Sequence, residues 1–195
     1  YLFIVFIVIL VFLITAIINF FNFMDGIDGL VASIFTFYLL YLSLTDSTNK
    51  IFLMVSLISF LLFNWKPARI FMGDSGSTFI GSVYVGTLLE ANDFNELLLR
   101  IIILSPLLGD AFITLLLRIL NKQNIFKGHK LHLYQRLNQG GMDHDKITIL
   151  YLGASMLLCL TGFYSLTSSL FLVLLIFLFG VYLNKNKAVP FNKYY

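Results

Sequence analysis

Charged residues are scarce in this 195-residue chain: they make up 12% of it, whereas hydrophobic residues make up 59%. Soluble proteins average roughly 25% charged residues, so this chain has too few to cover a water-exposed surface around its apolar content. The net charge of +3 is small and scattered. That excludes a nucleic-acid surface, and we expect no nucleic-acid partner. The composition predicts a protein of the lipid bilayer.

Cysteine and proline are also rare. One cysteine, three prolines and thirteen glycines exclude a disulfide scaffold, a collagen-like chain and a Pro-rich disordered segment. The single Cys159 lies in an apolar run, where a packing residue is expected rather than a reactive thiol. Alternating ten-residue strands are lacking as well, so a helical bundle is favoured over a transmembrane barrel.

Long apolar stretches are what the chain has instead. A helical span needs about 20 apolar residues, and several of the stretches are shorter and would need flanking residues to cross. We predict an all-α fold, a polytopic transmembrane helical bundle with about seven spans that forms a single integral-membrane domain over residues 1–195. The stretches are Tyr1–Ile18, Leu30–Leu44, Ile51–Phe63, Gly76–Leu89, Leu97–Leu120, Ile147–Tyr164 and Ser169–Leu183.

If all seven stretches cross, the basic residues divide unequally between the two faces. One face has only Lys50 and Arg100 as basic residues, together with the acids Asp46, Glu90, Asp93 and Glu96. The opposite face carries the other eleven basic residues and is therefore cytoplasmic by the positive-inside rule. These residues are Lys66, Arg69, Arg118, Lys122, Lys127, Lys130, Arg136, Lys146, Lys185, Lys187 and Lys193.

The first polar motif follows the first apolar stretch directly. It contains two amides, Asn19 and Asn22, and two carboxylates, Asp25 and Asp28, at a spacing of three. On a helix these side chains would lie along one side, whereas its glycines could break the helix and expose backbone N–H groups to an anion. The alternative is a polar helix end that caps the next helix.

The second polar motif runs from Asn64 to Ser77 on the same face. Its Gly-Asp-Ser-Gly sequence, with Asp74, offers a carboxylate, a hydroxyl and free backbone donors ahead of a helix. This set suits magnesium bridged to phosphate, and Lys66 and Arg69 could compensate phosphate charge. A turn with an N-cap is the alternative.

The third motif is a long basic loop that contains His129, His132 and Arg136. Histidine can bind metal or phosphate or relay a proton, although nothing completes a zinc-type ligand set. The alternative is a loop that holds anionic lipid head groups. Asp110 lies inside an apolar stretch, where it marks either a function or a structural pair with Arg118.

In this order the motifs resemble those of the polyprenyl-phosphate N-acetylhexosamine-1-phosphate transferases, glycosyltransferase family 4. The resemblance rests on Asn19-x-x-Asn22-x-x-Asp25-Gly-Ile-Asp28, on Ala68–Ser77, on Pro106–Asp110 with Arg118, and on the run His129–Leu137. It implies transfer of a sugar-1-phosphate from a UDP-N-acetylhexosamine to undecaprenyl phosphate, which gives undecaprenyl-diphospho-sugar and UMP. The expected location is the bacterial inner membrane, with the active face cytoplasmic.

The resemblance also implies roles for individual residues. Asp74 and Asn22 would hold Mg²⁺, with Mn²⁺ as an alternative, and Asp25 and Asp28 would order the nucleotide or assist the phosphate attack. The diphosphate would be neutralised by the basic loop. The remaining expected contacts are catalytic His129 and His132 and substrate-binding Asn19, Arg136, Lys66 and Arg69.

Within the family, the basic loop favours one branch, and the start of the chain favours one part of the fold. His129-x-x-His132 followed by Tyr-Gln-Arg136 is more similar to the branch that starts O-antigen and related surface glycans than to the triple histidine of the cell-wall branch. The chain begins at Tyr1 inside an apolar run and has no Asp-Asp pair, so we expect the C-terminal part of a longer enzyme, which could form a homodimer. The competing interpretations are a transporter that uses Asp25, Asp28 and Asp110, and a non-catalytic remnant.

Overall fold

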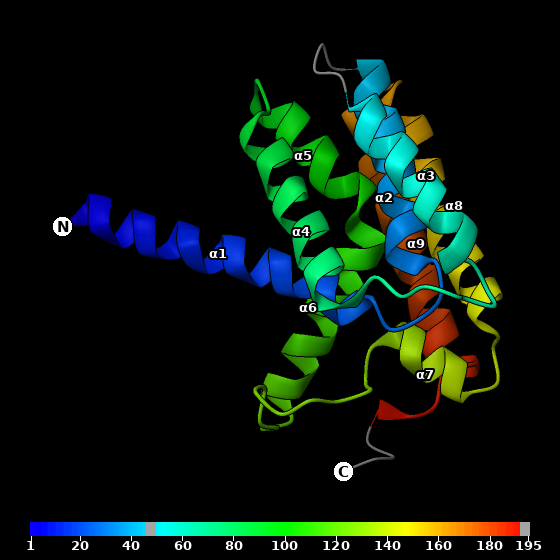
Figure 1. Cartoon of the computed structure of the whole chain (residues 1–195). Coiled ribbons are helices and arrows are strands. Elements are labelled where there is room, and N and C mark those ends of the chain that lie inside the picture. The colour runs from blue at the N-terminus through cyan, green and yellow to red at the C-terminus, as the bar shows by residue number, and fades with distance from the viewer. Residues whose placement is uncertain (46–49, 192–195) are drawn as a thin grey trace.

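The computed structural model describes residues 1–45 and 50–191, so Asp46 and Lys193 of the charge count lie outside the described residues. The predicted all-α fold is confirmed (Figure 1). Within the described ranges the helices are α1 (Leu2–Met24), α2 (Leu30–Thr45), α3 (Ile51–Asn64), α4 (Gly73–Leu89), α5 (Phe94–Ile103), α6 (Ser105–Leu120), α7 (Leu133–Gln139), α8 (His144–Gly162) and α9 (Leu166–Asn186).

Three of the helices in the described ranges are long and apolar enough to cross a membrane: α1, α8 and α9. A fourth span arises if α5 and α6 are taken together, and α2 and α3 are shorter apolar helices. All seven apolar stretches are therefore largely helical, whereas the number of about seven crossings stays a prediction.

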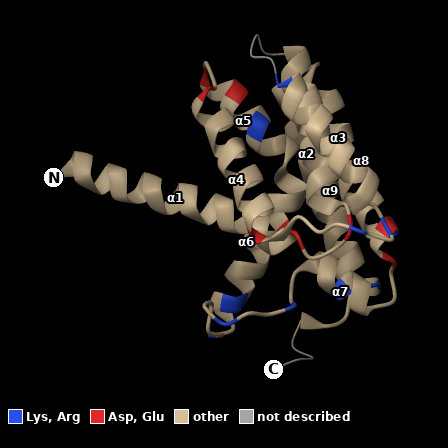
Figure 2. Cartoon of the chain, viewed as in Figure 1, with Lys and Arg blue, Asp and Glu red and all other residues tan. Residues whose placement is uncertain are grey.

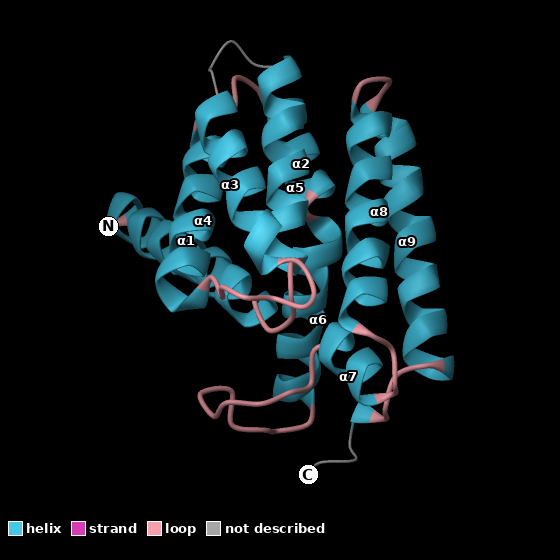
Figure 3. Cartoon of the chain, turned by 45° about the vertical axis from the view of Figure 1, so that its right-hand side comes forward, coloured by secondary structure: helices cyan, strands magenta, loops and turns pink. Residues whose placement is uncertain are grey.

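The stretch Leu97–Leu120 differs from the single span expected there. The chain bends by 78° between α5 and α6, and Pro106 stands in the first turn of α6. Proline has no N–H to donate and clashes with the preceding turn, so a helix entering from α5 must end before it. The break turns α6 toward the end of the bundle that carries the sequence motifs (Figure 3).

The core centres on α2, in which eleven of the sixteen residues are buried. Its aromatic side chains pack against those of α1 and α4: Phe35 meets Phe21 edge-on at 5.9 Å, and Tyr38 meets Tyr84 at 5.4 Å. The N-terminal half of α1 projects from this bundle (Figure 1) and exposes its apolar side chains. The C-terminal half of α1 is therefore the part that builds the core and the site.

Polar residues gather at two ends of the bundle (Figure 2). The α1–α2, α3–α4, α6–α7 and α7–α8 connections lie toward one end, which we call the motif end. The α4–α5 connection lies at the other end, with Glu90, Asp93 and Glu96. All three sequence motifs thus meet at one end, as predicted.

Candidate active site

A close crossing of α1 over α4 brings the first two motifs together. Gly81 faces the α1 backbone so closely that a Cβ atom there would lie 2.9 Å from Cα of Ile18. About one turn later on α1, and one to two turns earlier on α4, the Asn22 amide donates to Asp74 Oδ1 at 2.9 Å and to Ser77 Oγ at 3.1 Å. The crossing thus joins two residues that are 52 positions apart in the sequence.

Asn64 and Asp28 fasten the α1–α2 turn to its surroundings. Gly29 has a φ of +72° that favours glycine, and its N–H donates to Asn64 Oδ1 at 3.1 Å. Asp28 Oδ2 accepts from the Ala68 N–H at 3.2 Å, and its Oδ1 lies 3.5 Å from His144 Nδ1. Both carboxylate oxygens of Asp28 therefore already have partners, one on the α3–α4 loop and one on α8.

These residues surround a cavity of about 180 Å³, which we call the acidic cavity. Three carboxylates line it, and no lysine or arginine does. Its lining consists of Asn22, Asp25, Gly26, Ile27, Asp28, Asn64, Phe71, Met72, Gly73 and Asp74.

Two carboxylates of the acidic cavity, those of Asp25 and Asp74, repel each other. Burial and the nearby charge of Asp74 raise the pKa of Asp25 to about 7, because both effects disfavour a second negative charge. The described residues include no cluster of three His, Cys, Asp or Glu side chains arranged to hold a metal. Magnesium, however, commonly takes only one or two protein carboxylates and completes its shell with phosphate and water. The donor set of Asp74, Asn22 and Asp25 fits such a partly open site.

The basic loop meets the first motif through α7. The Tyr134 hydroxyl donates to the Phe23 carbonyl at 2.9 Å, and a Cβ on Gly26 would collide with that hydroxyl. The His132 ring stacks on the rings of Phe23 and Tyr134, and His129 lies 4.9 Å from it between ring centroids. The two histidines therefore lie beside the last turn of α1, although neither lines the acidic cavity.

Both imidazoles are poor bases in this environment. Burial, with the neighbouring His132 and Arg118, lowers the pKa of His129 to about 4. Burial likewise lowers the pKa of His132, against the opposing effect of the Asp110 carboxylate. At neutral pH both rings are mainly uncharged, so each can donate one hydrogen bond and accept one rather than act as a fixed cation.

The structure places the other predicted site residues outside the acidic cavity. Arg136 is buried and donates to the carbonyls of Leu131 and Val189 and to Asn184 Oδ1. The Asn19 amide donates to the carbonyl of Thr15 on its own helix. Lys66 lies 3.4 Å from Asp145 and 3.5 Å from Asp143, and Arg69 is exposed on the same loop.

Asp110 and Arg118 do not form the structural pair that was one of the alternatives. Arg118 donates to the loop carbonyls of Asn124, Ile125 and Lys127. Asp110 accepts from the N–H groups of Leu133 and Tyr134 at 2.7 and 3.1 Å. Each therefore fastens a different part of the basic loop.

Four residues of the site received no role from the sequence. Ser77 and Asn64 belong to the second motif, and their polar side chains beside Gly-Asp were the available signal. Tyr134 and His144 lie in the basic loop region, and only the fold shows that they reach Phe23 and Asp28.

Comparison with known proteins supports the family resemblance that the sequence motifs indicated. Residues 1–92 match Glycosyl transferase family 4. The chain is 36% identical over 105 residues to a probable undecaprenyl-phosphate N-acetylglucosaminyl 1-phosphate transferase of Bacillus subtilis (strain 168), which covers 51% of this chain and 29% of that protein.

Two further relatives carry a different name. The chain is 37% identical over 86 residues to a phospho-N-acetylmuramoyl-pentapeptide-transferase of Thermotoga neapolitana (42% of this chain, 27% of that protein). It is 27% identical over 118 residues to the protein of that name from Moorella thermoacetica (56% and 34%). The chain thus spans about a third of the length of the curated relatives it matches. No solved structure matches it.

Proposed function

We propose that this chain, whose residues 1–92 match glycosyl transferase family 4, forms part of a membrane enzyme that transfers a sugar-1-phosphate from a UDP-N-acetylhexosamine to undecaprenyl phosphate. The products are undecaprenyl-diphospho-sugar and UMP. An oxygen of the lipid phosphate bonds to the β-phosphorus of the nucleotide, and the bond from that phosphorus to the UMP oxygen breaks. The names of the Bacillus and Thermotoga relatives support this reaction class.

The observation that carries the proposal is the acidic cavity. Three carboxylates line it without a lysine or arginine, and the pKa of Asp25 rises to about 7 as a result of burial and of Asp74. A cavity of this kind favours a cation, and a cation there would in turn attract a diphosphate. Phosphoryl transfer requires mainly such positioning and charge neutralisation.

We assign Asp74 and Asn22 as the groups that hold Mg²⁺, or Mn²⁺ in its place. The bound ion would neutralise charge on the diphosphate. The Asn22 amide nitrogen donates to Asp74 and Ser77, so its oxygen would face the ion once the amide rotates. Asp25, with a pKa near neutrality, is suited to take a proton from the attacking lipid phosphate, and Asp28 orders the nucleotide side of the cavity.

The basic loop supplies donors from the other side. Neutral His129, whose Nδ1 accepts from the Leu131 N–H, can donate its Nε2–H to the diphosphate. His132 lies beside it, and a phosphate nearby would raise the pKa values of both histidines. Arg69 and Lys66 flank the cavity on the α3–α4 loop and can attract phosphate. Arg136 and Asn19 contribute by shaping the loop and the end of α1, where their bonds already lie.

The sugar donor, the branch of the family and the orientation in the membrane are part of the same proposal. The Bacillus relative, named for N-acetylglucosaminyl 1-phosphate transfer, supports an N-acetylhexosamine donor and the surface-glycan branch. About seven crossings would place the motif end in the cytoplasm, where UDP-sugars occur and the lipid phosphate can meet them. A transporter is disfavoured because Asp110, which lies within α6, is occupied in holding α7.

The test is UMP release by the longest in-frame gene product in membranes. Undecaprenyl phosphate, Mg²⁺ and a panel of UDP-N-acetylhexosamines would be supplied, beside Asp74→Asn and, as a matched carboxylate-to-amide control, Glu90→Gln at the other end of the bundle. Release that requires lipid, Mg²⁺ and Asp74 supports the proposal. A well-expressed protein that releases no UMP with any sugar would favour a remnant or a transporter.

A further inference from the structure

Asp110 is unusual because its carboxylate, on α6, accepts hydrogen bonds from groups on two other helices as well as from its own helix. Oδ1 accepts from the Leu133 N–H at 2.7 Å, and Oδ2 accepts from the Tyr134 N–H at 3.1 Å. Oδ2 also accepts from the Tyr151 hydroxyl at 2.7 Å, and Oδ1 from Thr114 Oγ1 at 3.2 Å. Asp110 thus caps the first turn of α7 from a neighbouring helix and ties it to α8.

The same carboxylate faces the imidazole of His132. Oδ1 of Asp110 lies 3.9 Å from His132 Nδ1, and both side chains are 4% exposed. The buried Nδ1 atom of His132 has no hydrogen-bond partner among the described residues. Stacking against Phe23 and Tyr134 limits the ring to small rotations. A shift of about 1 Å would bring Nδ1 to hydrogen-bond distance from Asp110.

We propose that Asp110 is the positioning residue for His132: its carboxylate fixes α7 and directs Nδ1–H of the imidazole toward itself, which leaves Nε2 as the group that meets the substrate. This inference rests on the proposed function, because it assigns the nitrogen with which the basic loop serves the transfer. A carboxylate behind one ring nitrogen selects the tautomer and orientation of the other.

The surroundings of His132 favour this arrangement over a charged imidazole. Arg118 and Arg136 are the cations near it, and both already donate to carbonyl oxygens of the chain. His129 is the other titratable neighbour on the loop, and its pKa is lowered to about 4. The Asp110 carboxylate is therefore the group that can accept a hydrogen bond from Nδ1–H of His132.

The position of His132 is coupled to the acidic cavity through the next residues of α7. Tyr134, whose N–H Asp110 holds, donates its hydroxyl to Phe23 and presses on Gly26, the neighbour of Asp25. Gln135 Nε2 donates to the same hydroxyl at 3.1 Å. One carboxylate on α6 thus sets both the imidazole and the contact of α7 with the end of α1.

The test reads the tautomer directly in the longest in-frame enzyme. Long-range ¹H–¹⁵N spectra of ¹⁵N-histidine-labelled protein at pH 8 can be assigned to His132 by comparison with His132→Gln. We expect His132 to carry its proton on Nδ1. In Asp110→Asn this preference is lost, and kcat for UMP release falls roughly 10- to 100-fold with KM for the UDP-sugar retained. Glu90→Gln leaves both unchanged.

An Nε2–H tautomer in the unmodified enzyme would overturn the inference, and so would an Asp110→Asn variant with the original tautomer and turnover. The first reading needs no variant, so it stands even where Asp110→Asn does not fold. Failure of the two proposals is separable. UMP release with an Nε2–H tautomer refutes only the role of Asp110, whereas an Nδ1–H tautomer in a protein that releases no UMP refutes only the transferase.

Discussion

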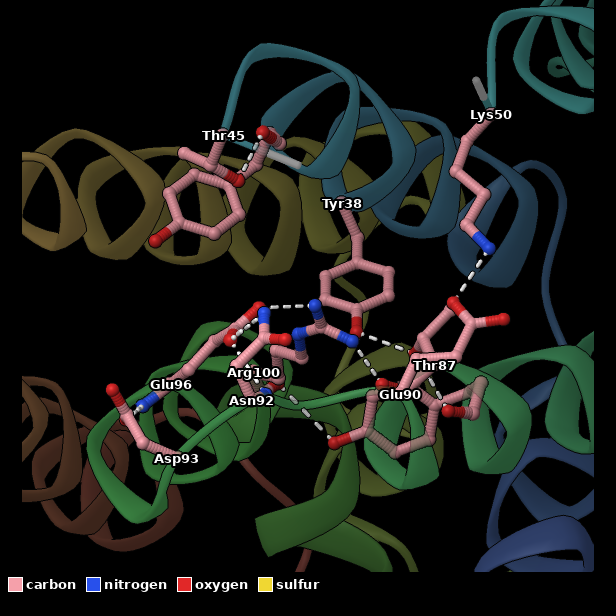
Figure 4. A network of polar contacts seen from close by, with 11 residues as sticks. Tyr38, Thr45, Lys50, Thr87, Glu90, Asn92, Asp93, Glu96 and Arg100 are labelled. Carbon is pink, nitrogen blue, oxygen red and sulfur yellow. Dashed lines mark hydrogen bonds and ion pairs between the residues drawn. The ribbon is translucent and has the colours of Figure 1, made fainter. Parts of the chain in front are cut away.

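Two polar regions at opposite ends of the bundle differ in whether their buried charges are balanced by groups of the chain. At the α4–α5 end, the buried Arg100 guanidinium is enclosed by groups that match it (Figure 4). At the motif end, three carboxylates line the acidic cavity without a lysine or arginine among the lining residues. The first region is electrostatically complete within the chain, and the second is not.

The region around Arg100 has the properties of a structural brace. Its guanidinium donates to the Glu96 carboxylate and to the Thr87 carbonyl, and its own carbonyl accepts from the Tyr84 hydroxyl. Tyr38 and Thr87 are joined by a 2.7 Å hydrogen bond. A buried cation held by a carboxylate and a carbonyl thus joins α4 to α5, and the Tyr38–Thr87 bond adds α2. The charge of the cation is balanced by Glu96 within the chain.

The acidic cavity lacks such compensation. Asp28 has its backbone and His144 contacts, and Asp74 accepts from Asn22, but burial and the charge of Asp74 raise the pKa of Asp25. A fold that balances buried charge at one end and leaves it unbalanced at the other indicates where a charged ligand belongs. The predictions below would break or sharpen this contrast.

The largest expected effect is that of Asp25→Asn. Removing the carboxylate should lower UMP release roughly 10²- to 10⁴-fold and yet stabilise the metal-free protein. Folding raises the pKa of Asp25 from 3.8 to about 7, so this carboxyl favours the folded state below pH 4, and that contribution is lost as the pH rises through 7.

The measurement is the melting temperature of Asp25→Asn at pH 8 without divalent ions. An increase of several degrees is expected, since each kcal/mol moves the melting temperature by roughly 2–4 °C. A lower melting temperature would show that the carboxylate is balanced by the chain, as Arg100 is, and would remove the contrast.

Arg100→Met should give the converse result. The free energy of unfolding is expected to fall by roughly 3 kcal/mol, because Glu96 and the Thr87 carbonyl lose their partner. UMP release per folded molecule should remain as in the unmodified enzyme. Thermal unfolding followed by the fluorescence of Trp65 measures the first quantity, and turnover normalised to folded protein the second. A stable variant with reduced turnover would make Arg100 functional rather than structural.

Turnover should also depend on pH through Asp25. A carboxyl with a pKa of about 7 must lose its proton to accept one, so kcat/KM should rise with pH and be roughly tenfold lower at pH 6 than on the alkaline plateau. In Asp25→Asn the residual activity should lose this dependence. A flat profile of the unmodified enzyme between pH 6 and 8 would contradict the assignment.

Lys66→Gln should have the smallest effect. Lys66 pairs with Asp143 and Asp145 at 3.5 and 3.4 Å, and these side chains are 38–54% exposed. Exposed pairs are worth less than about 1 kcal/mol, so we expect no change in melting temperature and roughly a twofold rise in KM for the UDP-sugar. A large loss of kcat would place Lys66 on the transferred phosphate instead.

Local features of the chain could be predicted from the sequence. Apolar composition and polar breaks located some helices closely, as at Ile51–Phe63 for α3 (Ile51–Asn64), but they gave no sign of the short helix α7. The motif around Asp25 and that around Asp74 were identified from their residue types, and the structure places them together.

Contacts between distant segments could not be predicted in this way. The role of Asp110 depends on α7 returning to α6, and that of Arg136 on Val189 and Asn184 from the end of the chain. Neither pattern has a local signature. Composition also concealed the break at Leu104, because a single Pro106 interrupts an otherwise continuous apolar stretch.

The central claim is that the acidic cavity binds a divalent cation together with the nucleotide diphosphate. The most direct measurement is Mn²⁺ binding to the longest in-frame enzyme, followed by electron paramagnetic resonance with and without UDP-N-acetylglucosamine. The account predicts one bound Mn²⁺ that the nucleotide strengthens, that Asp74→Asn loses, and that Glu90→Gln retains. Equal Mn²⁺ binding by all three proteins, or none by the unmodified enzyme, would contradict it.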